Sequence, residues 1–157
     1  MELSAAQRER YERNLLVEGF TDRMQQALIA ARVAVVGAGG LGSAALNYLV
    51  AAGVGHLTLI ENDTVSLSNL QRQVLYTTAD MGRPKAEVAA MRLSRLNPGC
   101  DIRVVTDRLT AANAAGLLGG HDAVVDCTDN YDARYVIDDF CREAEVPMIY
   151  GTAEAVG

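Results

Sequence analysis

Short apolar runs alternate with longer amphipathic segments along this chain. The runs are rich in Val, Ile and Leu, as in Arg-Val-Ala-Val-Val at 32–36. Near-continuous apolar runs of this length are typical of buried strands in a parallel sheet. Five segments are predicted as strands: 32–36, 56–61, 101–106, 123–127 and 147–150.

Amphipathic segments predict helices around and between these strands. The predicted helices cover 5–17, 23–30, 41–52, 84–96, 111–118 and 131–144. Pro84 suits the first turn of its helix, and Thr21-Asp22 suits a helix cap. The alternation predicts an α/β, Rossmann-like fold, with a mostly parallel sheet, right-handed crossovers and helices on both faces. We expect an N-terminal helical arm over 1–30 and a Rossmann-like domain over 31–157.

One long stretch carries no charged residue. Residues 33–60 contain no Asp, Glu, Lys or Arg, and the stretch is long enough to cross a bilayer. Six glycines interrupt it, and two of them lie close together in Gly-Val-Gly at 53–55. A strand, a helix and a second strand explain it better than a membrane span, so we interpret it as core and expect no membrane partner.

Charge and cysteine content narrow the possible functions. The 157 residues suffice for one domain with a core, and the formal net charge is −6. Nonspecific binding to nucleic acid needs clustered positive charge, so we expect no nucleic-acid partner. Cys100, Cys127 and Cys141 show no paired spacing, which predicts neither a disulfide framework nor a zinc site and fits a reducing compartment. Because residues 1–14 are polar and unlike a signal peptide, we expect a cytoplasmic protein.

A glycine cluster follows the first predicted strand and opens the next helix. Gly37, Gly39 and Gly42 form the pattern G-x-G-x-x-G. The first glycine allows the tight turn, the second lets the backbone approach a phosphate, and the third lets helix and strand pack closely. Free amides at the helix start then favour an anion. With the acidic Glu61 ending the second strand, the turn predicts a nucleotide site; a merely structural turn is the alternative.

Ligands of such folds lie beyond the carboxyl ends of the strands. Two more polar stretches lie there besides the glycine turn. One is the connection after Glu61, which carries Ser-Asn-Leu-Gln-Arg-Gln at 68–73 and Gly-Arg-Pro-Lys at 82–85. The other is Asp-Cys-Thr-Asp-Asn at 126–130. The basic residues of the connection suit a triphosphate.

At this point the chain resembles a known family. It is similar to the adenylyltransferases that activate ubiquitin-like sulfur carrier proteins in thiamine and molybdopterin synthesis, the ThiF/MoeB/HesA group, which are relatives of the ubiquitin-activating enzymes. The string at 68–73 is its most specific feature, and the likeness runs in the same order from about Arg10 to the last residue. The matching motifs are 37–42, 52–55, 68–73, 82–85, 97–98 and 126–130.

The resemblance implies an activity. Such enzymes adenylate the C-terminal glycine of a small carrier protein: its carboxylate attacks the α-phosphorus of ATP, and pyrophosphate leaves. Two anions must approach each other, so catalysis depends on positioning and charge neutralisation. The resemblance therefore implies ATP and Mg²⁺ as cofactors, a ubiquitin-like sulfur carrier protein as partner, and a homodimer.

The resemblance also implies roles for particular residues. Arg72 faces phosphate oxygens, Lys85 is a mobile point charge for phosphates, and Asp129 helps to hold the Mg²⁺ that bridges them. Arg13 matches a position that reaches into the neighbouring subunit's ATP site, as an arginine finger does. Glu61 departs from the family, which usually has Asp there to bind the ribose. The expected nucleotide-binding residues are Gly37, Gly39, Gly40, Gly42, Glu61, Ser68, Asn69, Arg72, Lys85, Asp129 and Asn130.

Each of these positions also has a purely structural interpretation. Arg72 could pair with a surface carboxylate, Pro84-Lys85 could be only a helix start, and Asn130 could be only a helix cap. We expect Arg72, Lys85 and Asp129 to lie outside the core. We interpret the two histidines (His56 and His121) as surface or strand-edge residues, and the cysteines as small hydrophobes.

Two alternative functions stay open. Family members usually continue further, with zinc-binding cysteine pairs and the surface that grips the carrier, so the chain could be a noncatalytic or truncated nucleotide-binding module. The glycine pattern and Glu61 would also suit an NAD-dependent oxidoreductase, although no Tyr-x-x-x-Lys pair occurs. The arm has little evident reason to be held by its own domain. Its apolar residues, Tyr11, Leu15 and Leu16, can share one helical face, which favours burial in a dimer.

Overall fold

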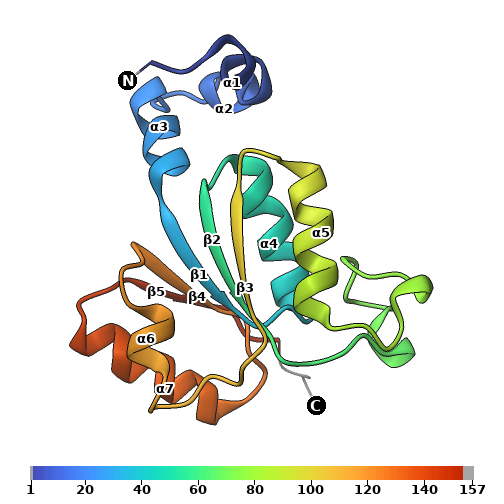
Figure 1. Ribbon diagram of the computed structural model, residues 1–157. Helices are drawn as coiled ribbons and strands as arrows, with labels where there is room; N and C mark the ends of the chain where they lie inside the picture. The colour runs from blue at the N-terminus through green and yellow to red at the C-terminus, as the bar shows by residue number, and fades with distance from the viewer. Residues whose placement is uncertain (1, 154–157) are drawn as a thin grey trace.

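The computed structural model describes residues 2–153 and contains one parallel sheet of five strands (Figure 1). The strand order is β3-β2-β1-β4-β5, and every pairing is parallel. All five predicted strands are confirmed, each ending within about one residue of its expected bounds. They are β1 Arg32–Val36, β2 His56–Ile60, β3 Asp101–Val105, β4 Ala123–Asp126 and β5 Met148–Tyr150.

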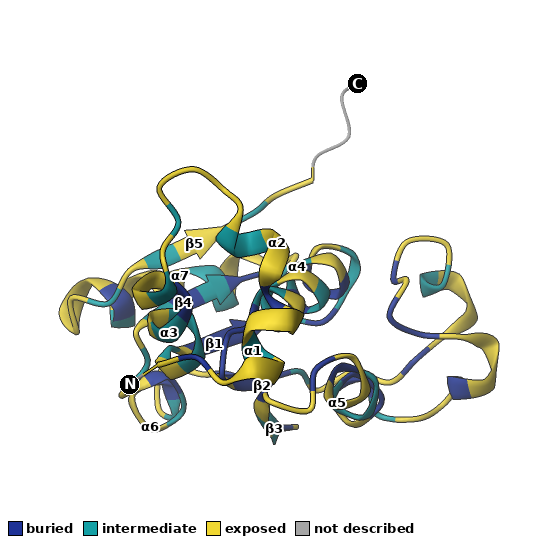
Figure 2. Ribbon diagram, turned by 90° about the horizontal axis from the view of Figure 1, so that it is seen from above, coloured by how far each residue is buried: buried dark blue, intermediate teal, exposed yellow. Residues whose placement is uncertain are grey.

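Helices cover both faces of the sheet, as predicted. On one face α4 (Gly40–Ala52) and α5 (Lys85–Leu96) pack with Val33 and Val35 of β1. On the other face α6 (Ala114–Leu118) and α7 (Tyr131–Glu143) pack with the alternate strand residues, such as Val36. Alternate side chains of a strand point to opposite faces, so an apolar run supplies both layers of core. Figure 2 shows the buried strands between helices whose outer faces are exposed.

The order of the strands places a crevice at a defined point. The chain builds β2 and β3 on one side of β1 and then returns to build β4 on its other side. The loops after β1 and β4 therefore diverge at the carboxyl edge, where open α/β sheets bind ligands. Within residues 2–153 no helix combines the length and apolar character that a membrane crossing requires.

Two of the predicted helices differ from the structure by more than one residue. Residues 5–17 form two helices, α1 (Ala5–Arg10) and α2 (Glu12–Leu15), because Tyr11 leaves the helical conformation and is buried. α6 begins three residues late, because the Asn113 side chain accepts a hydrogen bond from the Thr110 amide at 2.8 Å and closes a turn first. Pro84 occupies the N-cap position of α5. The predicted cap of α3 (Asp22–Ala30) is confirmed, since Thr21 Oγ1 accepts from the Met24 amide.

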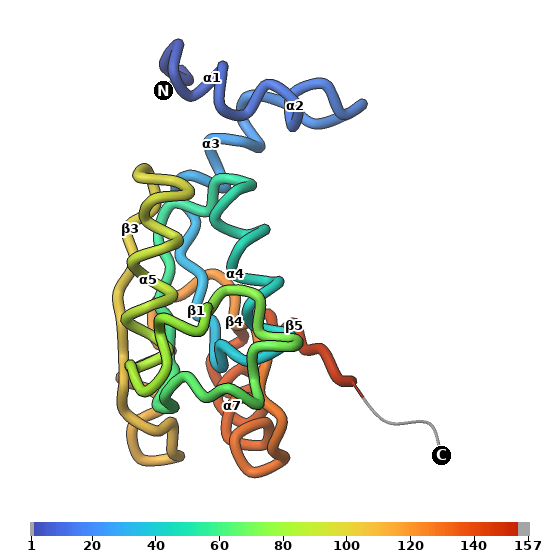
Figure 3. The backbone as a smooth tube through the Cα atoms, turned by 90° about the vertical axis from the view of Figure 1, so that its right-hand side faces the viewer, coloured from blue at the N-terminus to red at the C-terminus, as the bar shows by residue number. Residues whose placement is uncertain are grey.

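The expectation that the domain has little hold on the arm is wrong. Asn97 Nδ2 donates to Tyr11 Oη at 2.9 Å, and Asn14 Nδ2 donates to the carbonyl of Ala52 at 3.1 Å. The Arg10 guanidinium donates to the carbonyl of Leu96 at 3.1 Å. These carbonyls end α4 and α5, so the arm caps two core helices at the amino-terminal edge of the sheet (Figure 3).

Asn97 is the centre of this contact, and its replacement by Ala tests it. Its fully buried side chain also donates to the Val50 carbonyl at 2.9 Å and accepts from the Gly99 amide at 3.1 Å. Asn97→Ala leaves these groups without partners and should lower the free energy of unfolding by about 2–4 kcal/mol in urea denaturation. Asn62→Ala, at an exposed position, is the control and should change it by less than about 0.5 kcal/mol. Equal stability of the two variants would contradict this role for Asn97.

Candidate functional site

The glycine turn joins β1 to α4 in a space that admits no side chain. Gly37 has φ +94°, and a Cβ there would lie 2.9 Å from the carbonyl oxygen of Cys127. A Cβ on Gly42 would lie 2.1 Å from the carbonyl oxygen of Gly37. Gly39 is the N-cap of α4, and no side chain within residues 2–153 caps the helix, so its first amides are available to an anion. The predicted strand–turn–helix context is therefore present.

Glu61 ties this turn to the connection that follows β2. Its Oε2 accepts from the Ala38 amide and its Oε1 from the Asp63 amide, both at 2.8 Å. Each carboxylate oxygen keeps a second lone pair for a ligand hydroxyl. Glu61 thus shapes the site before any ligand binds, and its contact with a ribose stays a prediction.

Tyr76, which the sequence analysis missed, holds the turn from the opposite side. Its hydroxyl donates to the carbonyl of Ala38 at 2.9 Å, and the side chain is buried. Burial, with the nearby charge of Glu61, raises the pKa of Tyr76 well above its usual range, so the hydroxyl stays a neutral donor. The sequence did offer one indication that Tyr76 is buried: it follows the apolar Leu75 within an otherwise polar connection.

Arg72 lies directly over the glycine turn. A Cβ on Gly40 would lie 3.4 Å from Cδ of Arg72, so the aliphatic stem packs against the backbone there. The guanidinium donates to the carbonyl of Ser68 at 3.4 Å, and within residues 2–153 it has no carboxylate partner. The surface ion pair considered as its structural interpretation is absent from that part of the chain.

The string that carries Arg72 is ordered by its own side chains. Ser66 Oγ donates to Asn69 Oδ1 at 2.8 Å and lies 3.2 Å from Ser68 Oγ, at the short 3-10 helix Leu67–Asn69. Gln73 is buried beside Gly39, and in the described part of the chain its Oε1 has no hydrogen-bond partner. An unpaired buried acceptor is costly, and at the glycine turn it supports a ligand site.

The prediction that Lys85 lies outside the core is wrong. Its side chain is only 5% exposed, and Nζ lies 3.2 Å from Oδ2 of Asp63. The Lys85 amide also donates to the Asp63 carbonyl at 2.9 Å. Lys85 is the first residue of α5, and Ala86 and Val88 after it are core. The stem of Lys85 is therefore buried, while its ammonium reaches an exposed carboxylate. It is a fixed charge rather than a mobile one.

A buried ion pair organises the loop after β4. Asp126 is fully buried; its Oδ2 accepts from Nε of Arg134 at 2.7 Å, and its Oδ1 accepts from the amide and the hydroxyl of Thr128. Arg134, on α7, was not predicted as part of the site. Asn130 Oδ1 accepts from the Ala133 amide at 2.9 Å, which confirms the helix cap. Its nucleotide contact stays a prediction.

Asp129, which lies in the loop between Asp126 and Asn130, is exposed. It makes no ion pair or hydrogen bond with the other described residues. Across residues 2–153 no group of three or more His, Cys, Asp or Glu is placed to hold a metal ion. A metal bound by Asp129 would therefore take its other ligands from a bound phosphate and from water, which is the usual arrangement for Mg²⁺.

The cysteines behave as small hydrophobes. Cys100 and Cys141 are buried, and Cys127 packs beside the position of a Cβ on Gly42, at 3.5 Å. Burial, and secondarily the charge of Asp126, raises the pKa of Cys127 to about 11. Its thiol is therefore protonated at neutral pH and is no nucleophile.

The structure thus brings most predicted site residues to the carboxyl edge of the sheet, but it separates Arg13 from them. Arg13 is exposed and belongs to α2, which lies at the opposite end of β1 from the glycine turn (Figures 1 and 3). It does not reach the turn of its own chain. His56 and His121 lie at the amino ends of β2 and β4; His56 is about half exposed, and His121 is half-buried.

Comparisons with known proteins agree with this architecture. The ThiF family model matches residues 11–157. The chain is 49% identical over 152 residues to the molybdopterin-synthase adenylyltransferase of Salmonella typhimurium, covering 97% of this chain and 61% of that protein. It is 43% identical over 148 residues to the sulfur carrier protein ThiS adenylyltransferase of Escherichia coli, covering 94% of this chain and 58% of that one. The chain therefore spans about three fifths of the length of these curated relatives.

A solved structure is also similar. It is the E. coli tRNA N6-threonylcarbamoyladenosine dehydratase, TcdA, in complex with ATP, with a TM-score of 0.91 and 31% sequence identity. The match covers all of this chain and 65% of that chain. The likeness confirms the predicted fold class.

Asp80 supports the connection 61–85, and its charge should make stability depend on pH. Its buried carboxylate binds Arg92, Arg83 and Thr77. Burial alone would raise the pKa of Asp80, but the Thr77 hydrogen bonds and the two arginines outweigh it and lower the pKa. In the unfolded chain the pKa of an Asp is about 3.9, and above that pH the stabilisation by Asp80 is complete. It is lost as the pH falls through the lower pKa that Asp80 has in the folded protein.

We expect Asp80→Asn to lower the free energy of unfolding by about 1–3 kcal/mol near neutral pH and to flatten its decline on acidification. Denaturation of both chains across that pH range measures the difference. Asp107→Asn, at an exposed residue without an ion pair among residues 2–153, is the control and should keep the wild-type profile. Parallel profiles for wild type and Asp80→Asn would refute this role for Asp80.

Proposed function

The chain belongs to the ThiF family, and we propose that it acts as an ATP-dependent adenylyltransferase that activates the C-terminal glycine carboxylate of a ubiquitin-like sulfur carrier protein. The observation that carries the proposal is Arg72 packed over Gly40, which places a guanidinium with no carboxylate partner among residues 2–153 beside the open amides of α4. Relatives named as molybdopterin-synthase or sulfur-carrier adenylyltransferases are 43–49% identical, against 31% for the tRNA-modifying neighbour. That difference favours a carrier protein as substrate.

The proposed reaction needs negative charge neutralised on the phosphates of bound ATP and on the departing pyrophosphate. The amides of α4 and Arg72 stabilise the phosphates, and Lys85 stabilises the negative charge that develops as pyrophosphate leaves. Glu61 orients the ribose, and Ser68 and Asn69 border the same space. The resulting acyl adenylate is a mixed anhydride in which AMP is the leaving group for the next nucleophile.

ATP and Mg²⁺ are the proposed cofactors. The similar solved structure is named as a complex with ATP, and the glycine turn, Gln73 Oε1 and Arg72 together support the same ligand here. Asp129 would hold Mg²⁺ with the phosphates and water, where the ion supplies positive charge at the leaving group. The division into the arm (1–30) and the ATP-binding domain (31–157), and a cytoplasmic location suited to three free thiols, belong to the same proposal.

We further propose a homodimer in which Arg13 enters the partner's site. Two observations support it: Arg13 lies at the wrong end of the sheet for its own site, and Leu16, Val17 and Met24 of the arm are at least half exposed. Burying these side chains in a two-fold interface would be favourable. A cation supplied by the neighbour makes catalysis depend on assembly.

The central test compares nucleotides. ATP with Mg²⁺ should bind more tightly than NAD in calorimetry, and carrier-dependent ATP–pyrophosphate exchange should be detected, because Arg72 and Lys85 suit a triphosphate. Tighter binding of NAD would favour the oxidoreductase alternative. ATP binding without exchange, given a carrier with a free C-terminal glycine, would favour a noncatalytic module.

The second test removes single charges. Arg72→Ala, Lys85→Met and Asp129→Ala should each weaken ATP binding or exchange by about tenfold or more, as loss of a charge-assisted contact does. Met replaces Lys85 because it fills the buried space of the stem. Arg95→Ala, on the exposed face of α5, is the matched control and should change neither. If all three variants keep wild-type affinity and exchange, the assigned roles are wrong.

The third test examines the dimer. Light scattering should give twice the chain mass. Mixing an Arg13→Ala chain with a Lys85→Met chain should restore one active site in each mixed dimer, because that site combines the intact Lys85 of one chain with the intact Arg13 of the other. A monomer, or no rescue in an otherwise active protein, would exclude the arrangement in trans.

A further inference from the structure

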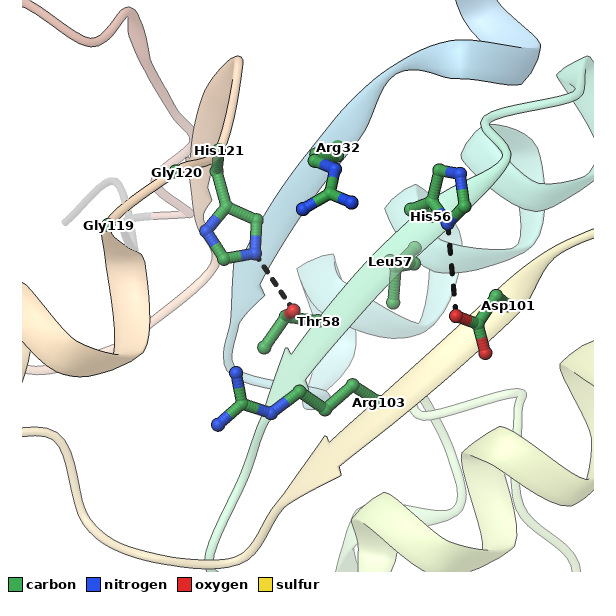
Figure 4. A pocket seen from close by; sticks show the side chains of 9 residues that line it. All are labelled: Arg32, His56, Leu57, Thr58, Asp101, Arg103, Gly119, Gly120 and His121. Carbon is green, nitrogen blue, oxygen red and sulfur yellow. Dashed lines mark hydrogen bonds and ion pairs between the residues drawn. The ribbon is translucent and has the colours of Figure 1, made fainter.

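A polar hollow lies at the opposite end of the sheet from the glycine turn. It has a volume of about 180 Å³ and opens on the face that carries α6 and α7 (Figure 4). It is lined by the first half of β1, β2 and β3 and by the Gly119–His121 loop. None of the residues assigned above to the nucleotide borders it.

The hollow exists because α6 is too short to cover the sheet. α6 has five residues, whereas α5 on the other face has 12. Further along the same face, Val36, Ile60 and Val105 form core, but the preceding positions on β2 and β3 are Thr58 and Arg103. A parallel sheet is normally apolar on both faces, so polar side chains at this corner need a separate explanation.

Two exposed arginines, Arg32 and Arg103, line the hollow. Arg103 stands on the edge strand β3, yet its side chain extends across β2, and the Arg32 guanidinium reaches down between the rings of His121 and His56 (Figure 4). Neither guanidinium makes a hydrogen bond or ion pair with another residue in the described part of the chain. Charged side chains on edge strands, including those that point inward, often serve only to deter strand pairing, but this does not account for Arg32, which belongs to the central strand β1.

The other side chains are already fixed. The His121 ring lies 2.9 Å from the Leu118 carbonyl through Nδ1 and 2.8 Å from Thr58 Oγ1 through Nε2. A carbonyl can only accept, so Nδ1 carries a proton. The one carboxylate of the lining, Asp101, faces His56 at 3.8 Å. Asp122, outside the lining, accepts from the Arg32 backbone amide at 2.8 Å. With the histidines neutral, the lining carries two positive charges and one negative charge, in a chain of net charge −6.

We propose that this hollow binds a phosphate group, held between the guanidinium groups of Arg32 and Arg103. Two planar guanidinium groups match the oxygens of a tetrahedral oxyanion. The charge-assisted hydrogen bonds they form are stronger than hydrogen bonds between neutral groups. The volume is below the range of pockets for drug-sized ligands, so it suits an ion or a terminal phosphate rather than a whole nucleotide. The site is independent of the proposed adenylyltransferase activity.

Inorganic phosphate is the probe, added at constant ionic strength with chloride as the exchanged anion. We expect saturable NMR shifts at the amides of Gly119, Gly120 and His121, with a dissociation constant in the millimolar range or tighter. Arg32→Gln and Arg103→Gln should each weaken binding by about tenfold. Arg95→Gln should not weaken phosphate binding. Arg72→Ala should leave the shifts of Gly119, Gly120 and His121 unchanged, because Arg72 lies at the carboxyl edge of the sheet.

Two further measurements identify the source of the phosphate and separate a loss of binding from a loss of folding. Tighter binding of ribose 5-phosphate than of inorganic phosphate identifies a phosphate carried on a larger molecule, and the reverse identifies the free ion. Arg103→Lys keeps the charge without the planar guanidinium group and should bind with intermediate affinity, even if a Gln variant alters the whole spectrum. Shifts that never saturate, that chloride reproduces, or that survive both Gln variants would overturn the proposal.

Discussion

The structure depends on one close approach of backbones, where the turn after β1 passes between the start of α4 and the end of β4. Neither Gly37 nor Gly42 has room for a Cβ, because carbonyl oxygens occupy those positions. This contact fixes where α4 begins and therefore where its free amides lie. Glu61 and Tyr76 then bind the amide and the carbonyl of Ala38, so both neighbouring segments take their position from the turn.

The parallel sheet explains why the polar chemistry gathers at its two edges. Both faces of the strands are needed for core, so functional side chains must sit where strands end or where a covering helix is absent. At the carboxyl edge the connection 61–85 supplies them, supported from inside by Asp80 and Arg92. At the amino edge, the arm covers the helix ends, and the short α6 leaves the corner around Arg103 open.

Much of this architecture could be predicted because its signals are local. The apolar runs defined all five strands, and the glycine spacing placed the turn correctly between β1 and α4. The break at Tyr11 was missed because it depends on Asn97, 86 positions away in sequence. The burial of Lys85 and the ion pair of Asp126 with Arg134 likewise result from packing in three dimensions. Residue type and spacing identified candidates for the site, but they do not report which charges are already paired.

Pairing distinguishes the cations at the carboxyl edge in a way that bears on binding. Among the described residues, the guanidinium of Arg72 hydrogen-bonds only a carbonyl oxygen, so an arriving phosphate would displace little. Lys85 is buried and bound to the exposed carboxylate of Asp63, so a phosphate at Lys85 must compete with that carboxylate or share the ammonium with it. A buried lysine left without any partner would be costly, and Asp63 removes that cost before a ligand binds. For the proposed ATP ligand this pairing favours binding first at the glycine turn and Arg72, and engagement of Lys85 only by displacing Asp63 or by sharing the ammonium with it.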